Sequence, residues 1–231
     1  MPHIVKSFDE ELDRLRETLV RMGNLTRQQF GRALEALVQQ DSLLAKQVGE
    51  GDGEIDQLEH AVNDQVVRVL ALRAPLADDL RTVVASLKIA SDFERIADYA
   101  ANIARRSQLL NAHAQLPAIR TVRRMGTLVE RQIEEVTAAQ LERDAGKAVA
   151  VWNNDLAVDE SYSSLFRELL TYMMEDPHTI GPASHLLFIA KNIERIGDHT
   201  TNISEMVYFV ITGKYIEGDR PKSDSSSFPN V

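Results

Sequence analysis

The chain carries the same segment twice, 100 residues apart. Residues 87–103 read LKIASDFERIADYAANI and residues 187–203 read LFIAKNIERIGDHTTNI, with nine of seventeen positions identical and no gap. Such a repeat predicts a tandem duplication in which each copy is one supersecondary unit. Four of the shared positions are polar, so a core does not explain them: Glu94, Arg95, Asp98 and Asn102, with their partners 100 residues on.

Apolar residues recur at intervals of three and four, which is typical of helices, and strand patterns are nearly absent. A capping box, Ser7 with Glu10, predicts the start of the first helix. In the first half, the expected helices are one that ends before the Gly-rich run 49–53, one that carries Ile55 to Val69 and stops before Pro75, and one over about 76–110. In the second half, they cover about 118–152, about 154 to the residue before Pro177, and about 182–212, ending at Gly213.

Pro75 and Pro177 occupy matching turns of the two halves. Three helices with short turns and one apolar seam form an up-down-up bundle. We therefore expect an all-α protein of two tandem three-helix bundles, with six long antiparallel helices. The repeats would span 1–114 and 115–216, and the Ser-, Pro- and Asp-rich residues 217–231 would form a disordered tail.

The composition narrows the classes of partner. The net charge is −9 and no basic stripe stands out, which argues against nucleic acid. The absence of cysteine excludes disulfides and thiolate metal sites. The N-terminus lacks the pattern of a signal peptide, and no run of eighteen apolar residues occurs, so we expect a cytoplasmic protein without a transmembrane span.

The repeated polar residues fall on one helical line. Positions i, i+4 and i+8 of a helix lie nearly above one another, and this line is expected to face away from the apolar seam. Its members are Glu94, Asp98 and Asn102 in the first copy, and Glu194, Asp198 and Asn202 in the second. Each middle helix begins with a further acidic pair: Asp52 with Asp56, and Asp155 with Asp159.

Two explanations of these carboxylates stay open. Carboxylate and amide oxygens are the ligands of hard cations, and the two acidic pairs of one half could face each other across a groove and bind one or more ions. Alternatively, Arg95 and Arg195 could form surface ion pairs with their neighbours, and Asp52 and Asp155 could be N-caps.

Other candidate positions carry less weight. His60, His178 and His185 have no counterparts in the other copy, and Trp152 is expected to pack at a helix end. Glu175 and His178 have the spacing found in di-iron bundles, but Pro177 between them predicts a turn. Two basic pairs, Arg105–Arg106 and Arg123–Arg124, are interpreted as isolated and solvated, and no phosphate pocket is expected.

Taken together, the ERIAD and ERIGDH segments, the acidic pairs of the middle helices and the two Pro turns resemble the PhoU family, regulators of bacterial phosphate uptake. The resemblance covers about residues 5–215. It implies a non-enzymatic, cytoplasmic homodimer that represses the phosphate-starvation response. It also implies protein partners, namely the ATPase of the phosphate ABC transporter and a sensor histidine kinase, with membrane association only through them.

The same resemblance implies a possible metal centre, although none is required. Some family members hold surface clusters of metal ions on paired acidic motifs, which map to Glu94 with Asp98 and Glu194 with Asp198, and less securely to the middle-helix pairs. A divalent or trivalent ion, iron, zinc, manganese or magnesium, is the candidate. The alternative function is a carboxylate-bridged metal-binding bundle that acts as an enzyme or a metal store.

Overall fold

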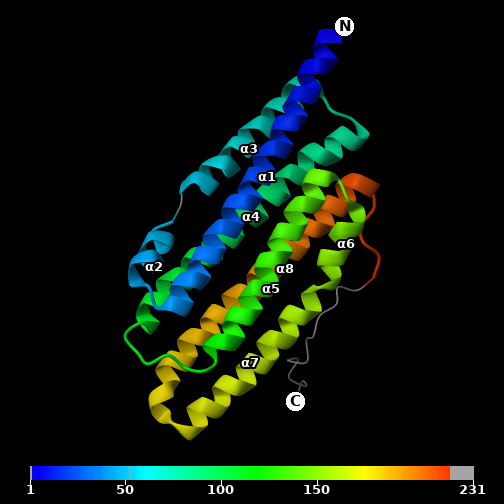
Figure 1. Ribbon diagram of the computed structural model, residues 1–231. Helices are drawn as coiled ribbons and strands as arrows, with labels where there is room; N and C mark the ends of the chain where they lie inside the picture. Colours follow the sequence, from blue (N-terminus) through cyan, green and yellow to red (C-terminus); the bar gives the residue numbers. More distant parts are fainter. Residues whose placement is uncertain (1, 52, 219–231) are drawn as a thin grey trace, which may run out of the picture.

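The chain folds into long helices joined by short turns. The computed structural model describes residues 2–51 and 53–218 (Figure 1). The first half contains α1 (Pro2–Gln39), α2 (Ser42–Gly49), α3 (Gly53–Arg73) and α4 (Ala77–Leu110). The second half contains α5 (Ile119–Glu142), α6 (Ala145–Asn153), α7 (Asp155–Glu175), the short 3-10 turn η1 (Pro177–Thr179) and α8 (Ile180–Thr212). The described residues include no strand, so the all-α prediction with six long helices is confirmed.

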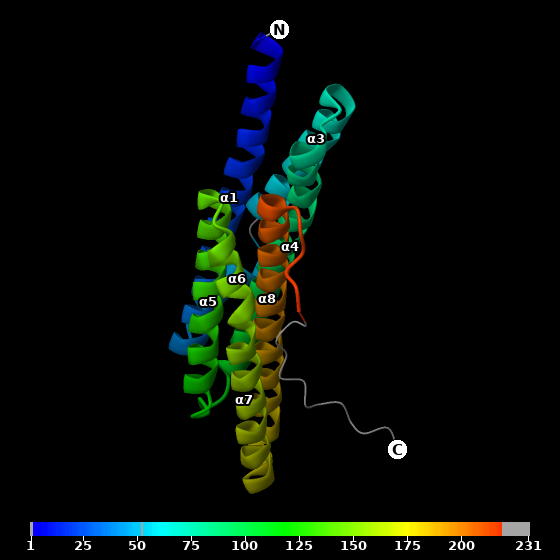
Figure 2. The same cartoon turned by 90° about the vertical axis from the view of Figure 1, so that its right-hand side faces the viewer.

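The two halves meet along their third helices. α4 and α8 run antiparallel at the centre of the molecule (Figures 1 and 2). α1, α2 and α3 pack on α4, and α5, α6 and α7 pack on α8 in the same way. The buried apolar side chains form one cluster that includes Phe93 of the first half and Ile193 of the second. The repeats therefore share a single core.

The duplication extends over the full length of these central helices. Positions 100 residues apart are buried together well beyond the segment that is similar in sequence. The matching buried pairs are Thr82/Pro182, Val83/Ala183, Ser86/Leu186, Ile89/Ile189, Ala90/Ala190, Phe93/Ile193, Ile96/Ile196, Ala97/Gly197, Ala100/Thr200, Ala101/Thr201, Ile103/Ile203, Ala104/Ser204 and Ser107/Val207. Surface positions of α4 and α8 can therefore also be compared one by one.

The first helix of each repeat is interrupted, in contrast to the single helix predicted from the sequence. Instead of one helix up to residue 48, α1 ends at Gln39 and α2 begins after Asp41, whose carboxylate accepts the backbone N–H groups of Leu43 and Leu44 at 2.9 Å. The predicted helix 118–152 is likewise divided into α5 and α6, where Asp144 accepts the N–H of Lys147 at 3.0 Å.

Each interruption has the same local design. Gln40 and Arg143, which precede the capping aspartates, both adopt φ of 54°, the left-handed conformation that ends a helix. This conformation costs a non-glycine residue about 1–2 kcal/mol. The cap and the packing of α2 on α4 and of α6 on α8 offset that cost.

The start of the chain also differs from the prediction. α1 begins at Pro2, so Ser7 lies inside the helix and the capping box is not its start. The predicted tail falls mostly outside the described residues, which end at residue 218. Within the described part, no helix has both the length and the apolar character needed to cross a bilayer.

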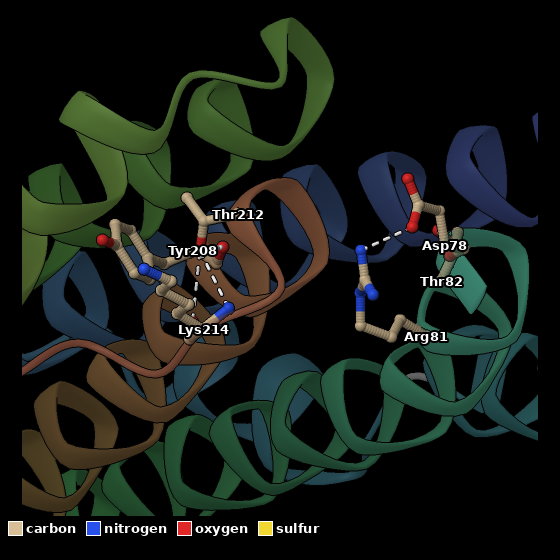
Figure 3. Close-up of polar contacts among 6 residues, drawn as sticks. All are labelled: Asp78, Arg81, Thr82, Tyr208, Thr212 and Lys214. Atoms are coloured by element: carbon tan, nitrogen blue, oxygen red, sulfur yellow. Dashed lines mark hydrogen bonds and ion pairs between the residues drawn. The ribbon is translucent and has the colours of Figure 1, made fainter.

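The C-terminal end of α8 lies against the start of α4 (Figure 3). Gly213 takes φ of 72° as the C-cap, and Lys214 donates its backbone N–H to the Thr212 hydroxyl at 3.2 Å. Arg81 of α4, bonded to Asp78 at 2.7 Å, lies so close that a Cβ at residue 213 would be 3.2 Å from its guanidinium carbon. A glycine is therefore favoured at this position by backbone conformation and by space.

Candidate functional site

The repeated carboxylates are less exposed than predicted. Asp98 is outward, with 54 % of its side chain exposed, but Glu94 is only 21 % exposed and Glu194 only 15 %. The prediction that the whole line faces away from the core is thus wrong for the two glutamates. The prediction assumed that each helix packs along one apolar seam, whereas α4 and α8 each have neighbouring helices on several sides.

In the first half, Glu94 lies among other acids. Its carboxyl group lies beside that of Asp98, where a hydrogen bond can form once one of the two is protonated, and the charge of Glu59 of α3 adds repulsion. Burial raises the pKa of Glu94, and the negative charge of Asp98 raises it further. Arg95, 3.6 Å from Glu94 and 3.9 Å from Asp98, lowers it only in part. This arrangement would favour a proton or a cation.

The acid of α3 whose charge acts on Glu94 is Glu59, which the sequence pattern did not identify. The predicted pair was Asp52 with Asp56; Asp52 lies outside the described residues, and Asp56 is exposed one turn before Glu59. The backbone carbonyl of Asp56 contacts Nδ1 of His60 at 2.9 Å. Glu59 carried no signal in the repeat, because Tyr162 occupies the matching position 103 residues later.

In the second half, Glu194 already has a cationic partner. Lys191 Nζ lies 2.5 and 2.7 Å from its two carboxylate oxygens. The matching residue of the first half is Ser91, which cannot supply a charge. The Lys191 ammonium also lies 5.3 Å from the centre of the Tyr162 ring. The two copies of the motif therefore differ in charge balance.

The middle-helix pair of the second half lies partly in the core. Asp155 is only 2 % exposed and accepts a hydrogen bond from the Thr201 hydroxyl at 3.3 Å. Gln132, also buried, and Gly197 lie beside it, since a Cβ at Gly197 would be 3.8 Å from Asp155 Oδ1 and 3.7 Å from Gln132 Oε1. Asp159 is half-buried one turn later. Asp155 is the first residue of α7, and the N-cap is Asn154.

The two asparagines, Asn102 and Asn202, are the last residues of the predicted polar lines. Asn102 Oδ1 accepts a hydrogen bond from Arg105 at 2.8 Å, so this amide oxygen is directed to a guanidinium. Asn202 is half-buried on α8. Among the residues that the structure describes, no group of three or more His, Asp or Glu side chains is placed to hold a metal ion.

The remaining predictions have mixed outcomes. Trp152 packs at the end of α6 and donates its ring N–H to Glu205 at 3.0 Å, and Glu175 and His178 are separated by the turn before η1, as predicted. Arg123 and Arg124 are exposed, as predicted. For Arg105–Arg106 the prediction holds in part: Arg105 is exposed and Arg106 is half-buried, but the pair is not isolated, because both residues line a groove together with cations of α8.

Comparisons with known proteins agree with this architecture. A family model described as the PhoU domain matches twice, at residues 19–107 and 122–207. A protein of Caulobacter vibrioides named "Phosphate-specific transport system accessory protein PhoU homolog" is 44 % identical over 96 % of this chain and 97 % of its own length. A protein of the same name from Zymomonas mobilis is 49 % identical over 92 % of this chain and 90 % of its own length.

Two solved structures share the fold. The crystal structure of PhoU from Pseudomonas aeruginosa superposes with a TM-score of 0.86 at 39 % identity, covering 90 % of this chain and all of that one. The phosphate transport system regulatory protein PhoU from Streptococcus pneumoniae gives a TM-score of 0.83 at 28 % identity, covering 91 % of this chain and 99 % of that one. The duplicated domain, the central α4–α8 pair and these similarities over nearly the whole length show that the chain belongs to the PhoU family, whose members are named as accessory proteins of phosphate transport.

Proposed function

We propose that this protein is a cytoplasmic, non-enzymatic regulator that restrains phosphate uptake and the phosphate-starvation response through protein contacts. Its partners would be the ATPase of the phosphate ABC transporter and the sensor histidine kinase of the response. The family membership supports a role in phosphate transport. The protein contacts are supported by apolar side chains left exposed at two hairpin tips.

The tips lie at opposite ends of the molecule (Figures 1 and 2). At the α3–α4 tip, Leu72 is 70 % exposed and Leu76 is 79 % exposed. At the α7–α8 tip, Met174 is 85 % exposed and Ile180 is 49 % exposed. Large apolar residues gathered in this way are typical of surfaces that bind another protein, either a partner or a second copy in the proposed homodimer.

Gene deletion with complementation tests this role. Without the protein, a reporter of phosphate starvation should be active in phosphate-rich medium, and wild-type protein should restore repression. Leu76→Ser and Met174→Ser should restore it poorly, whereas Leu43→Ser, a matched change at a 68 % exposed leucine of α2, should restore it fully. Normal repression in the deletion strain would contradict the proposal.

We further propose that a metal ion, where one binds, prefers the first half. Glu94 and Asp98 repel each other there, and a divalent or trivalent cation would replace this repulsion by attraction, with water or further carboxylates completing the coordination. Glu194 of the second half already binds Lys191. The alternative of an enzyme or a metal store would need a larger set of ligands than the described residues bring together.

Elemental mass spectrometry of untagged protein tests this preference. Glu94→Gln with Asp98→Asn should remove more bound iron, zinc or manganese than Glu194→Gln with Asp198→Asn. Equal loss from the two variants would contradict it. If no preparation carries metal, the carboxylates of both halves are better explained by ion pairs and docking.

A further inference from the structure

A basic groove runs between α4 and α8. It has a volume of about 600 Å³ and lies where the C-terminal half of α4 passes the N-terminal half of α8. Four of the residues that line it are cations, and none of the described lining residues is a carboxylate. The lining residues are Asn102, Arg105, Arg106, Leu109, Phe188, Lys191, Asn192 and Arg195.

Neutral groups hold the arginines in place. Arg105 donates to the carbonyl oxygen of Gly49 and to Asn102 Oδ1, both at 2.8 Å. Arg106 lies over the ring of Phe188 at 4.1 Å, and Arg195 lies 5.7 Å from the centre of the Tyr99 ring. These contacts orient the guanidinium groups without cancelling their charge. Lys191 differs, because Glu194 neutralises it in part.

The absence of a side chain at Gly49 leaves space for Arg105. A Cβ at Gly49, the last residue of α2, would lie 2.9 Å from Arg105 Cγ and 3.4 Å from its backbone nitrogen. The glycine thus lets the end of α2 approach α4 closely enough for its carbonyl to fix Arg105. Arg105 is therefore a placed residue of the groove and not a freely solvated one.

The other end of the α4–α8 interface provides an internal comparison. Most of the matching positions 100 residues away hold different side chains, so the charge of the groove is not a consequence of the fold. Arg105, Arg106 and Lys191 correspond to Glu205, Met206 and Ser91, and only Arg195 has a cationic counterpart, Arg95. Asn192 points the same way, because it corresponds to the acidic Asp92, whereas Phe188 corresponds to Lys88 and so adds one positive charge to the matching end.

At the matching end, two of the acidic side chains have partners of their own. Asp92 pairs with His199 at 2.7 Å, and Glu205 accepts the Trp152 ring N–H. Its charged residues, Lys88, Asp92, Arg95 and Glu205, sum to zero. In a chain with a net charge of −9, four cations gathered on one groove indicate a negatively charged ligand.

We propose that this groove binds an oligophosphate, either a free phosphate chain or the phosphate chain of a nucleotide. Arginine forks bind phosphate oxygens through paired hydrogen bonds, and the amides of Asn102 and Asn192 are further donors. Three to four cationic charges match a ligand with three to four negative charges better than they match a single phosphate. The volume lies within the range of about 300–1,000 Å³ that is typical of small-ligand sites.

Isothermal titration calorimetry with the full-length protein tests the proposal. The probes are inorganic tripolyphosphate, ATP and orthophosphate, each at the same ionic strength because polyanion binding depends on salt. Tripolyphosphate and orthophosphate together test chain length, and ATP against tripolyphosphate distinguishes the nucleotide from the free chain. We expect tripolyphosphate or ATP to bind with one site per chain and orthophosphate to bind at least about tenfold more weakly.

The internal repeat supplies the variants. Arg105→Glu with Arg106→Met introduces the residues of the matching end and should weaken tripolyphosphate binding at least about tenfold. Arg123→Glu with Arg124→Met makes the same charge change on an exposed pair of α5 and should leave binding unchanged. If circular dichroism shows that the first variant is poorly folded, Lys191→Ser takes its place. This change leaves the Arg105 contacts intact and should also weaken tripolyphosphate binding.

Three results would overturn the proposal. The first is the absence of specific binding, seen either as no binding of tripolyphosphate and ATP or as equal weakening in the α5 control, which would indicate a general effect of charge. The second is binding of orthophosphate as tight as that of the longer chains. The third is tighter binding of a glutamate-rich peptide, titrated as a fourth probe, than of either phosphate chain, which would identify the groove as a protein-docking surface.

Discussion

Glu94 and Glu194 occupy the same position of the repeat and meet opposite electrostatic surroundings. Asp98 and burial disfavour the ionised form of Glu94, whereas Lys191 contacts both oxygens of Glu194. The difference arises mainly from Ser91 against Lys191 on the central helices, and also from Glu59 against Tyr162 on the middle helices. A motif retained in two copies can therefore serve different roles in each.

Glu94→Gln is expected to stabilise the protein at neutral pH. The pKa of Glu94 is raised in the folded state, so the folded protein holds this proton more tightly than the unfolded chain does. The stability contributed by the proton is complete below the ordinary glutamate pKa of about 4.3 and is lost as the pH rises through the folded-state value. Urea unfolding should show a higher free energy of unfolding than wild type at pH 7, and a smaller difference near pH 4.

The matched control is Glu194→Gln. Removing this charge leaves Lys191 without its partner, so the free energy of unfolding should fall or stay constant at pH 7. A destabilised Glu94→Gln protein at pH 7 would show that Arg95 outweighs burial and the charge of Asp98.

Gly126→Ala is expected to lower the free energy of unfolding by about 1–3 kcal/mol through overpacking. A Cβ on Gly126 of α5 would lie 2.6 Å from both methyl carbons of Leu34 on α1, and Leu34 is itself buried. The comparison is Gly181→Ala in α8, where nothing lies within 4 Å of the added atom. That change should be neutral or slightly stabilising in chemical denaturation, because alanine is the better helix former.

At the scale of elements, the breaks after α1 and α5 show that a periodic apolar pattern does not by itself predict where a helix ends. The apolar stripe continues through both breaks, so the pattern predicts one helix. The decisive residues are Asp41 and Asp144, each preceded by a residue with positive φ. An aspartate within a helical period is equally consistent with a solvated surface position, and it becomes a recognisable cap only because both repeats place it at the same point.

Asp41→Ala and Asp144→Ala should each reduce the free energy of unfolding by about 0.5–2 kcal/mol, the usual value of an N-cap. Asp41→Asn and Asp144→Asn should retain most of the stability, because the asparagine side chain also accepts the backbone N–H groups. Urea denaturation of the four variants measures both effects. If asparagine proves as harmful as alanine, the carboxylate charge and not the capping bond is responsible.

At the scale of the whole molecule, the two repeats are expected to unfold together. Their apolar side chains belong to one cluster, and the α4–α8 pair is the most extensive helix contact in the described structure. Calorimetry should show one transition whose calorimetric and van't Hoff enthalpies agree. Two separated transitions would mean that each repeat is stable without the other.

Much of the fold could be predicted from the sequence, and less of the site. The period of three and four, Pro75, Pro177 and Gly213 placed the six long helices, and the repeat identified Glu94 and Glu194. Glu59 and the basic groove were missed because their contacts cross helices. Arg105 and Lys191 are 86 positions apart in the sequence and meet only through the packing of α4 on α8.

The antiparallel pairing of α4 and α8 has a consequence for symmetry. In a homodimer of single repeats joined in this way, an isologous contact would place every residue at both ends of the interface. A groove with Arg105 at one end would then carry Arg105 at the other end as well. Joining the repeats in one chain removes that constraint, so the molecule can keep one end charge-balanced while the other is positive. Covalent linkage has thus turned a self-complementary interface into one with direction.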